Sequence, residues 1–325
     1  MNVVVIGLGS MGQRRIRLIK QYSKEIQIFG IDLNEERRSN CKKLWDIQTA
    51  ENLSELCQNE KIECAFISTS PLSHASIIKE CLEQNMHVFT ELNLVSDGYL
   101  ENIKLAKNKS LTLFLSSTFL YRKEIEAIKE SVLSTPDKLN YTYHVGQYLP
   151  DWHPWEKYQD FFIGHQRTNG CRELFAIELP WIIDIFGEIE TIEVNKDKNT
   201  TLSINYNDNY QVMIKHVSGH KGVLSVDVIS RKAVRNLEVY GEHLYLEWDG
   251  SPEGLYAFNC DKKEMQAITL YEKIDQLENY SHFVVENAYF NEIDVFFNTL
   301  KGQDTARYTF EKDQKTLEII DWIEC

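Results

Sequence analysis

The decisive stretch of this chain lies at its start, where residues 3–15 read Val-Val-Val-Ile-Gly-Leu-Gly-Ser-Met-Gly-Gln-Arg-Arg. The apolar run Val3–Ile6 is typical of a buried strand, and the residues after Gly12 follow a helical pattern. Between them, Gly7 permits a tight turn, Gly9 lets the backbone approach a pyrophosphate, and Gly12 allows close packing of helix on strand. The stretch therefore predicts a dinucleotide-binding turn, with the phosphates at the helix N-terminus.

An acidic residue follows at the spacing that such a turn requires. Asp32 ends the second apolar run, Gln27–Ile31, and stands 20 residues after Gly12. A carboxylate in this place accepts hydrogen bonds from the ribose hydroxyls and repels a 2′-phosphate. NAD is therefore favoured over NADP as the cofactor, and the neighbouring Arg37 and Arg38 keep NADP as the second choice.

Short apolar strands alternate with helical patterns over the first 120 residues, which predicts a doubly wound parallel sheet of the Rossmann type. From residue 121 onward, strands follow one another with few helices between them, as in an antiparallel sheet. One of these expected strands is Thr201–Tyr206. We expect an NAD(P)-binding domain over 1–120 and an α+β domain over 121–325, which holds the substrate and the oligomer interface. Helices are expected near 281–300 and 311–324, and the last one is able to pack back on the first domain.

Composition narrows the class of protein. The chain has 325 residues, 43% of them hydrophobic, and its net charge of −14 argues against nucleic acid or an anionic membrane as partner. Its seven cysteines have no C-x-x-C spacing, so neither a disulfide framework nor a metal site is expected. With no signal peptide and no apolar run that could span a bilayer, the sequence predicts a cytoplasmic protein.

Several motifs together resemble those of the glucose–fructose oxidoreductase / inositol dehydrogenase / MocA (Gfo/Idh/MocA) family. They are the Gly7–Gly12 turn, Asp32, Thr69-Ser70-Pro71 followed by His74, and the run His87–Glu91. The resemblance covers nearly the whole chain, and it implies hydride transfer between a nicotinamide and a hydroxyl of a sugar or polyol. It also implies a homodimer or homotetramer. The expected cofactor-binding residues are Gly7, Leu8, Gly9, Ser10, Met11, Gly12, Asp32, Ser68, Thr69, Pro71, His74 and Glu91.

Two landmarks depart from the family pattern. The family usually has Glu-Lys-Pro after its fourth strand, with a catalytic lysine, whereas this chain has Glu91-Leu92-Asn93. An Asp and a His that the family carries on a later helix correspond here to Leu174 and to Ile177 or Glu178. Three interpretations follow: an NAD-dependent oxidoreductase, an NAD-binding sensor or scaffold without activity, and an enzyme whose tightly bound NAD is reduced and reoxidised within one turnover.

The segment Tyr143–Tyr158 mixes aromatic residues with acids and imidazoles, a combination that suits the faces and hydroxyls of sugar rings. It resembles a branch of the family associated with nucleotide sugars and sialic-acid-like sugars of bacterial surface polysaccharides. The substrate is therefore expected to be a small sugar or sugar nucleotide. The alternative is a loop whose aromatic residues anchor it in the sheet or in a dimer interface.

Proton transfer requires an acid or base near the substrate hydroxyl. The candidates are His153, because imidazole titrates near neutral pH, and Glu173 and Glu178, whose pKa values burial would raise. Glu178 interrupts an apolar helix face and could instead form a structural ion pair with Arg172 or Arg167. Residues expected to contact substrate are Tyr121, Trp152, His153, Arg167 and Arg172.

Overall fold

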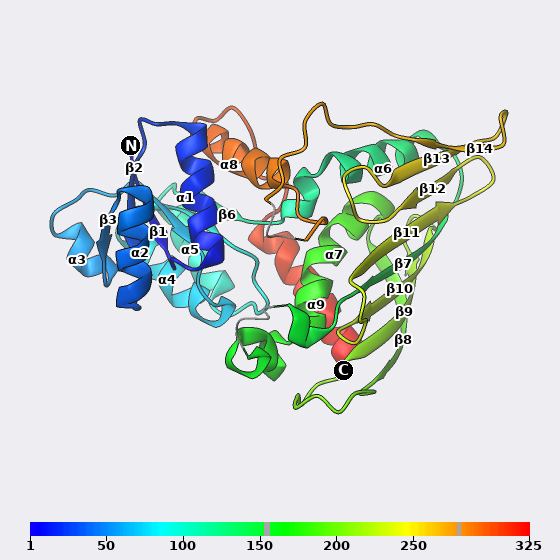
Figure 1. The fold of residues 1–325 in the computed structure, drawn as a ribbon, viewed down its shortest axis with the longest axis horizontal. Helices are drawn as coiled ribbons and strands as arrows, with labels where there is room; N and C mark the ends of the chain where they lie inside the picture. The colour runs from blue at the N-terminus through cyan, green and yellow to red at the C-terminus, as the bar shows by residue number, and fades with distance from the viewer. Residues whose placement is uncertain (153–156, 278–280) are drawn as a thin grey trace. The chain divides into compact units, whose positions relative to one another are not determined.

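The computed structural model describes residues 1–152, 157–277 and 281–325, which form two compact units (Figure 1). The first unit contains Met1–Ser117 and Tyr289–Lys315, and the second contains Thr118–Ala288 and Thr316–Cys325. The division near residue 117 lies close to the boundary expected at 120. Residues 289–315, however, join the N-terminal unit, so the chain returns to it earlier than the sequence analysis expects.

The first unit is built on a six-stranded sheet in the order β3-β2-β1-β4-β5-β6, in which every neighbouring pair is parallel. Its strands are β1 (Asn2–Ile6), β2 (Gln27–Ile31), β3 (Gln48–Ala50), β4 (Cys64–Ile67), β5 (His87–Thr90) and β6 (Leu113–Leu115). The connecting helices are α1 (Ser10–Tyr22), α2 (Glu35–Trp45), α3 (Leu53–Cys57), α4 (His74–Glu83) and α5 (Tyr99–Asn108). The strand order reverses between β1 and β4, and this confirms the predicted Rossmann fold.

An aromatic ladder explains why residues from 289 onward belong to the first unit. Phe66, Phe89 and Phe114 stand opposite one another on β4, β5 and β6, with ring centroids 4.7 and 5.1 Å apart. Phe296 of α8 (Glu286–Leu300) packs edge-on against all three rings at 5.1 to 5.6 Å. Burial of four aromatic rings is a strong hydrophobic contribution, and it holds α8 on this sheet.

The second unit contains an eight-stranded sheet in the order β14-β13-β12-β11-β7-β10-β9-β8. Its strands are β7 (Asn140–Gly146), β8 (Ile189–Asp197), β9 (Asn209–His216), β10 (Lys221–Asp227), β11 (Val234–Tyr240), β12 (Tyr245–Trp248), β13 (Leu255–Asn259) and β14 (Glu264–Ala267). All pairs are antiparallel except β7 with β10. The predicted large, mainly antiparallel sheet is therefore confirmed.

Side chains on this sheet alternate between a buried and a solvent-facing side. On β7, Tyr141, Tyr143 and Val145 are buried, and the ring of Tyr143 packs edge-on against Trp181 of α7 (Gly170–Phe186). The helices of this unit include α6 (Lys123–Ser134), α7 and the end of α9 (Phe310–Glu324), and α6 and α7 lie on one side of the sheet (Figure 1). Short 3-10 turns are η1 (Pro71–Ser73), η2 (Thr118–Tyr121), η3 (Leu149–Asp151), η4 (Tyr158–Asp160), η5 (Phe162–Gly164) and η6 (Gln166–Thr168).

Two expected elements differ from the structure. Residues 201–206 form no strand, because the buried Asp208 draws the preceding loop onto itself. Its carboxylate accepts hydrogen bonds from the amides of Asn199 and Thr200, at 2.8 and 2.9 Å, and from the Thr200 hydroxyl. The helix expected from residue 281 begins only at Glu286. In the described ranges, no helix is both long and apolar enough to cross a bilayer.

Candidate cofactor and catalytic site

The glycine turn has the geometry that its sequence predicts. Gly7 adopts a φ of +91°, and a Cβ there would lie 2.5 Å from the Ser68 carbonyl oxygen. A Cβ on Gly12 would lie 1.8 Å from the carbonyl oxygen of Gly7, so no larger residue fits between α1 and β1. Around Gly9, by contrast, a Cβ would meet only the tip of Arg37 at 3.9 Å. The turn is therefore closed toward the sheet and open above Gly9, where the pyrophosphate of a dinucleotide would lie.

The N-terminus of α1 fits a pyrophosphate. The helix has 13 residues, and its N-cap, Gly9, provides no side chain to cap the first-turn amides. Exposed amides and the positive end of the helix dipole favour an anion in this position. The residues present therefore fit a dinucleotide phosphate group, which the amides around Ser10, Met11 and Gly12 would hold.

Asp32 lies directly beside the glycine turn. One carboxylate oxygen accepts a hydrogen bond from the Leu8 amide at 2.8 Å, and the other accepts one from the Asn34 amide, also at 2.8 Å. The exposed Arg37 guanidinium is 3.8 Å from the same carboxylate. Asp32 is thus fixed at the carboxyl end of β2, where it can bind ribose hydroxyls, and Arg37 is a nearby cation for a 2′-phosphate.

The turn after β4 is held by His74, which is almost completely buried at the start of α4. Its Nε2 is 3.0 Å from the Thr69 carbonyl oxygen, and its Nδ1 is 2.6 Å from the side chain of Asn93. Burial lowers the pKa of His74. The imidazole therefore anchors the Ser68–Pro71 turn, which is the structural role that a histidine in this place most often has.

Glu91, at the end of β5, is bound to Arg15 of α1 by two hydrogen bonds of 2.6 and 2.9 Å. Arg15 is completely buried. Ser68, at the end of β4, donates a longer bond of 3.4 Å to the same carboxylate. Glu91 thus lies at the carboxyl edge of the sheet, as expected of a pocket residue, but its carboxylate is committed to an arginine.

Residues 1–116 match the model of the GFO_IDH_MocA family, described as an oxidoreductase family with an NAD-binding Rossmann fold. The N-terminal domain thus matches the sequence pattern of the Gfo/Idh/MocA oxidoreductases. Its cofactor is NAD, consistent with the open glycine turn and with Asp32. No curated protein matches the sequence.

Solved structures share the fold of the whole chain at low sequence identity. An oxidoreductase from Agrobacterium radiobacter, in complex with NAD+, L-tartaric acid and magnesium, is 13% identical with a TM-score of 0.82, over 99% of this chain and 94% of that one. UDP-N-acetylglucosamine 3-dehydrogenase GnnA from Acidithiobacillus ferrooxidans is 13% identical with a TM-score of 0.75, over 100% and 96%. A levoglucosan dehydrogenase, in complex with NADH and L-sorbose, is 12% identical with a TM-score of 0.81, over 99% and 95%. Both units of this chain therefore have counterparts of similar fold among solved structures.

Glu173 differs from Glu178 in having a carboxylate oxygen without a hydrogen-bond partner among the described residues. It lies in the first turn of α7, and its Oε2 atom is buried without a hydrogen bond to any residue that the structure describes. Burial raises the pKa of Glu173 to about 7, while the charge of Arg235 opposes this rise. A carboxyl group that exchanges its proton near neutral pH is suited to general acid–base catalysis.

Glu178 has the opposite character, because both of its oxygens are occupied. Oε1 accepts hydrogen bonds from Arg235 at 3.0 and 3.1 Å, and Oε2 accepts them from the Tyr143 hydroxyl and the Trp181 indole at 2.8 and 2.7 Å. The prediction that Glu178 pairs with Arg172 or Arg167 is wrong, since Arg235 on β11 is its partner. This network joins α7 to β7 and β11, and it accounts for the buried carboxylate.

Replacing Arg235 by Met is expected to lower the free energy of unfolding by about 3 kcal/mol, because Glu178 would remain buried without its counter-charge. Urea unfolding followed by circular dichroism measures this change. Lys129→Met is the matched control, since the Lys129–Asp184 pair is solvent-exposed, and we expect about 0.5 kcal/mol or less from it. A loss below about 1 kcal/mol for Arg235→Met would contradict the role given to the Glu178 network.

Arg172, expected to bind substrate, is buried and paired within the second unit. It is 2.7 Å from Asp321 and also forms an ion pair with Glu324, both on α9. Asn169, the N-cap of α7, donates a hydrogen bond to Glu324 as well. These contacts tie the start of α7 to the end of α9. The guanidinium is thereby engaged by two carboxylates, which gives it a structural role.

The remaining candidates have separate positions. Tyr121 is 1% exposed at the end of η2 and belongs to the core, so its ring offers no open face to a substrate. Trp152 is partly exposed and donates its indole N–H to the Gln147 carbonyl oxygen at 3.1 Å. Arg167 is exposed in η6. His153 lies outside the described residues.

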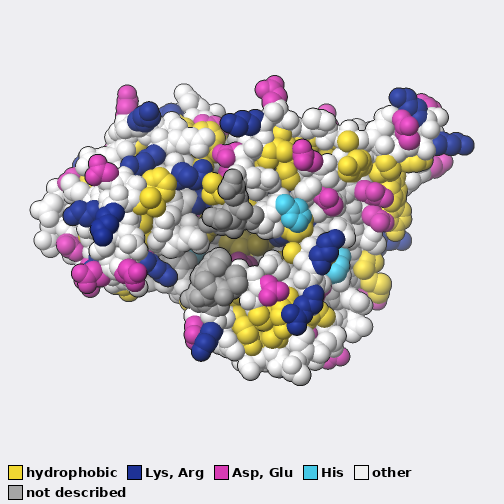
Figure 2. Space-filling view, in the orientation of Figure 1, with side chains coloured by type: hydrophobic (Ala, Val, Ile, Leu, Met, Phe, Trp, Pro, Cys, Tyr) yellow, Lys and Arg dark blue, Asp and Glu magenta, His cyan; other side chains and the backbone are white. Residues whose placement is uncertain are grey.

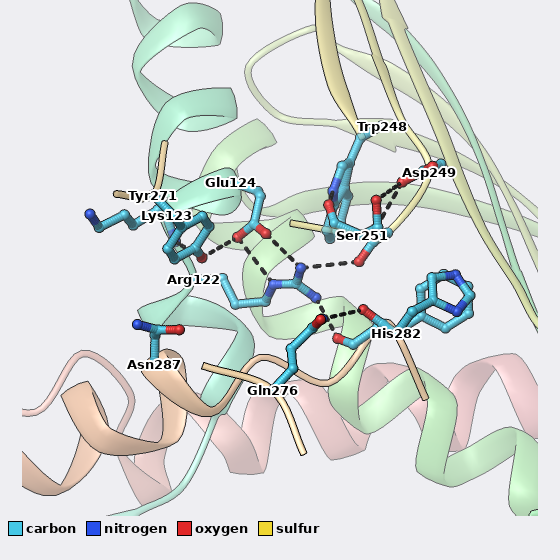
Figure 3. Close-up of polar contacts among 12 residues, drawn as sticks. Arg122, Lys123, Glu124, Trp248, Asp249, Ser251, Tyr271, Gln276, His282 and Asn287 are labelled. Carbon is cyan, nitrogen blue, oxygen red and sulfur yellow. Dashed lines mark hydrogen bonds and ion pairs between the residues drawn. The ribbon is translucent and has the colours of Figure 1, made fainter. Parts of the chain in front are cut away.

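Sequence reasoning missed a second buried arginine cluster, which Figure 3 shows. Arg122 forms a two-pronged ion pair with Glu124 at 2.7 and 3.2 Å, and it also donates to the carbonyl oxygens of Gly250 and Phe283. Tyr271 donates to the same glutamate at 2.8 Å. The other partners, Gly250, Phe283 and Tyr271, come more than 120 residues later in the chain. Only the Arg122–Glu124 pair was therefore visible in the sequence. No group of three or more metal-ligating side chains occurs among the described residues.

Proposed function

We propose that this chain is an NAD-dependent oxidoreductase that oxidises a hydroxyl of a sugar or sugar nucleotide, with Glu173 as the base that accepts the hydroxyl proton. The supporting observation is the buried Oε2 atom of Glu173, which forms no hydrogen bond with a described residue, together with the pKa of this carboxyl group of about 7. NAD supplies the hydride acceptor when bound. The hydroxyl hydrogen leaves as a proton to the carboxylate of Glu173, while the hydrogen on carbon leaves with its electron pair.

The substrate class is supported by fold relatives whose printed names include a UDP-N-acetylglucosamine dehydrogenase and a levoglucosan dehydrogenase. Partly exposed aromatic residues such as Trp152 and Tyr148 suit a sugar ring. The guanidinium of Arg231 lies over the Tyr148 ring, 3.7 Å from its centroid. This cation would suit an anionic substituent of the substrate. A role in surface-polysaccharide biosynthesis stays a prediction.

Incubation of the purified chain with NAD+ and a panel of UDP-sugars, sialic-acid-like sugars and neutral sugars tests this proposal. Appearance of the absorbance of reduced nicotinamide with at least one member is the expected result. Binding of NAD+ without turnover across the whole panel would overturn it.

Leu92 favours a second function, in which the domain binds NAD as a sensor or scaffold. Leucine replaces the lysine of the family and can neither bind a hydroxyl nor move its proton. If Leu92→Lys creates activity where the natural chain has none, the sensor interpretation is supported. If the natural chain is active, and loses activity on substitution of Glu173, the sensor interpretation fails. NAD retained through purification would point to the third interpretation, an enzyme that reuses its bound cofactor.

The solvent-facing side of the second sheet supports association with a second copy. Exposed apolar side chains lie on this side. Figure 2 shows hydrophobic atoms at the right edge of the view, where Figure 1 places the second sheet. These residues are Met213, Val223, Tyr240, Tyr256, Phe258 and Met265. Lys215 and Lys221 stand opposite each other on β9 and β10, while Glu238 and Glu247 do so on β11 and β12. A two-fold axis along β7 would bring the lysines of one copy onto the glutamates of the other.

Glu238→Lys is therefore expected to weaken the dimer at least about tenfold, because it places lysines of the two copies opposite each other. Light scattering over a concentration series measures the dissociation constant. Adding Lys221→Glu should restore the dimer, and Glu101→Lys on α5 is the control for a change in net charge. A natural chain that is monomeric at micromolar concentration would refute this proposal.

A further inference from the structure

The first unit contains a buried ionic cluster in which one arginine binds two carboxylates. The Nη2 atom of Arg15 donates to Glu91 at 2.9 Å and to Glu292 of α8 at 2.8 Å, and also to the Ser116 hydroxyl at 3.2 Å. Glu292 has no solvent exposure, and its other oxygen accepts the Ser117 amide at 2.8 Å. Two carboxylates thus share one fully buried guanidinium.

Glu292 adds a negative charge to this cluster of arginine side chains. Arg14, next to Arg15 on α1, lies over the Tyr289 ring at 4.6 Å, and Arg15 lies over the same ring at 5.4 Å. Both guanidinium groups thus lie against the Tyr289 ring, and Glu91 and Glu292 are carboxylates hydrogen-bonded to Arg15. Burial raises the pKa of Glu292, whereas Arg15 lowers it. Loss of the Glu292 charge would make the cluster more positive by one unit.

The cluster reaches the cofactor crevice through Glu91. Glu91 follows β5 and Ser68 follows β4, and the Ser68 hydroxyl donates to the Glu91 carboxylate. A dinucleotide lies across the carboxyl ends of a doubly wound sheet, with one nucleotide on each side of the point where the strand order reverses. Asp32 marks the adenosine side, so β4 and β5 form the nicotinamide side. The Glu91 side chain is 12% exposed, and the cluster behind it is screened little by solvent.

We propose that Glu292 sets the preference of this domain for oxidised over reduced cofactor. The nicotinamide ring is positively charged in NAD+ and neutral in NADH, so a more positive cluster weakens the binding of NAD+ and not that of NADH. Glu292 is a positioning residue in this role, because it acts through Arg15 and Glu91. The inference rests on NAD binding and needs no substrate, so it stands or falls independently of Glu173.

Calorimetric titration of Glu292→Gln with NAD+, NADH and ADP-ribose tests the proposal. We expect the ratio of the NAD+ to the NADH dissociation constant to rise about fivefold or more. The dissociation constant of ADP-ribose, which lacks the ring, should change less than about twofold on the same electrostatic argument. Glu292→Asp retains the charge and should keep the natural ratio. Glu101→Gln removes an exposed carboxylate of the same unit, where the charge is screened, and should leave all three constants unchanged.

Equal weakening of all three ligands would show a purely structural role and overturn the proposal, as would an unchanged ratio. Since removal of one member of a buried ionic cluster can prevent folding, Glu91→Gln provides a second variant. It removes the other carboxylate charge and should shift the ratio in the same direction, with ADP-ribose again unaffected. A shift in favour of NAD+ in either variant would contradict the inference.

Discussion

Glu173→Gln is expected to lower kcat about a thousandfold with the substrate found in the panel, while the dissociation constant of NAD stays unchanged. Glutamine fills the same space but cannot accept the hydroxyl proton, and loss of a general base typically costs two to four orders of magnitude. Asp184→Asn is the matched control, because Asp184 lies on the same helix and pairs with Lys129 at the surface. Equal loss of activity in both variants, or none in Glu173→Gln, would remove Glu173 from the mechanism.

The pH dependence follows from the same carboxyl group. As a base, Glu173 must be ionised, so kcat/KM should rise with pH and level off above its pKa of about 7. In the Glu173→Gln variant, the residual kcat/KM should no longer show an ionisation near pH 7. A profile whose limb lies near pH 4.5 instead would mean that the carboxyl group is not desolvated in the working protein.

Stability should change in the opposite direction to activity. In the folded protein the pKa of Glu173 is about 7, above the ordinary value of 4.5. The contribution of this carboxyl group to stability is therefore fully present below pH 4.5, and it is lost as the pH rises through 7. Above pH 7, Glu173→Gln should therefore be more stable than the natural chain, by at most about 3 kcal/mol. Thermal unfolding at pH 5 and pH 8 measures the difference, which should be larger at pH 8.

Asp32→Ser should change cofactor selection about a hundredfold, from NAD toward NADP. The shorter, neutral side chain loses charge-assisted hydrogen bonds to the ribose hydroxyls, each worth roughly 1.5–3 kcal/mol, and no longer repels a 2′-phosphate. Arg37, now 3.8 Å from the Asp32 carboxylate, becomes available to the phosphate. Titration with both cofactors measures the two dissociation constants.

The double variant Asp32→Ser with Arg37→Ala separates these two causes. It should bind NAD as weakly as the single variant but lose most of the gain for NADP. Glu35→Ser, which removes a carboxylate from the first turn of α2, is the control for a general change in charge. If Asp32→Ser leaves the ratio unchanged, Asp32 does not contact the ribose.

The cofactor half of this protein was readable from the sequence because its chemistry is local. Gly7, Gly12 and Asp32 lie within 26 residues, and their spacing alone specifies a strand, a turn and a helix with a carboxylate beside it. The structure places all three as that spacing predicts. His74 is also placed by short-range contacts, with Thr69 only five residues away.

The partners of the buried charges depended on the tertiary structure. Glu178 and Glu173 lie five residues apart on one apolar helix and look equivalent in the sequence, but only Glu178 meets Arg235, from β11, 57 residues later. Arg15 pairs with Glu91 and with Glu292, 277 residues away, which no local pattern in the sequence indicates. The local pattern determined where NAD binds, because turn and helix geometry follow from short-range sterics. The Oε2 atom of Glu173 has no partner among the described residues, and burial raises the pKa of this group to about 7. Both properties were decided only when distant strands and helices packed together, since desolvation and pairing depend on the folded surroundings.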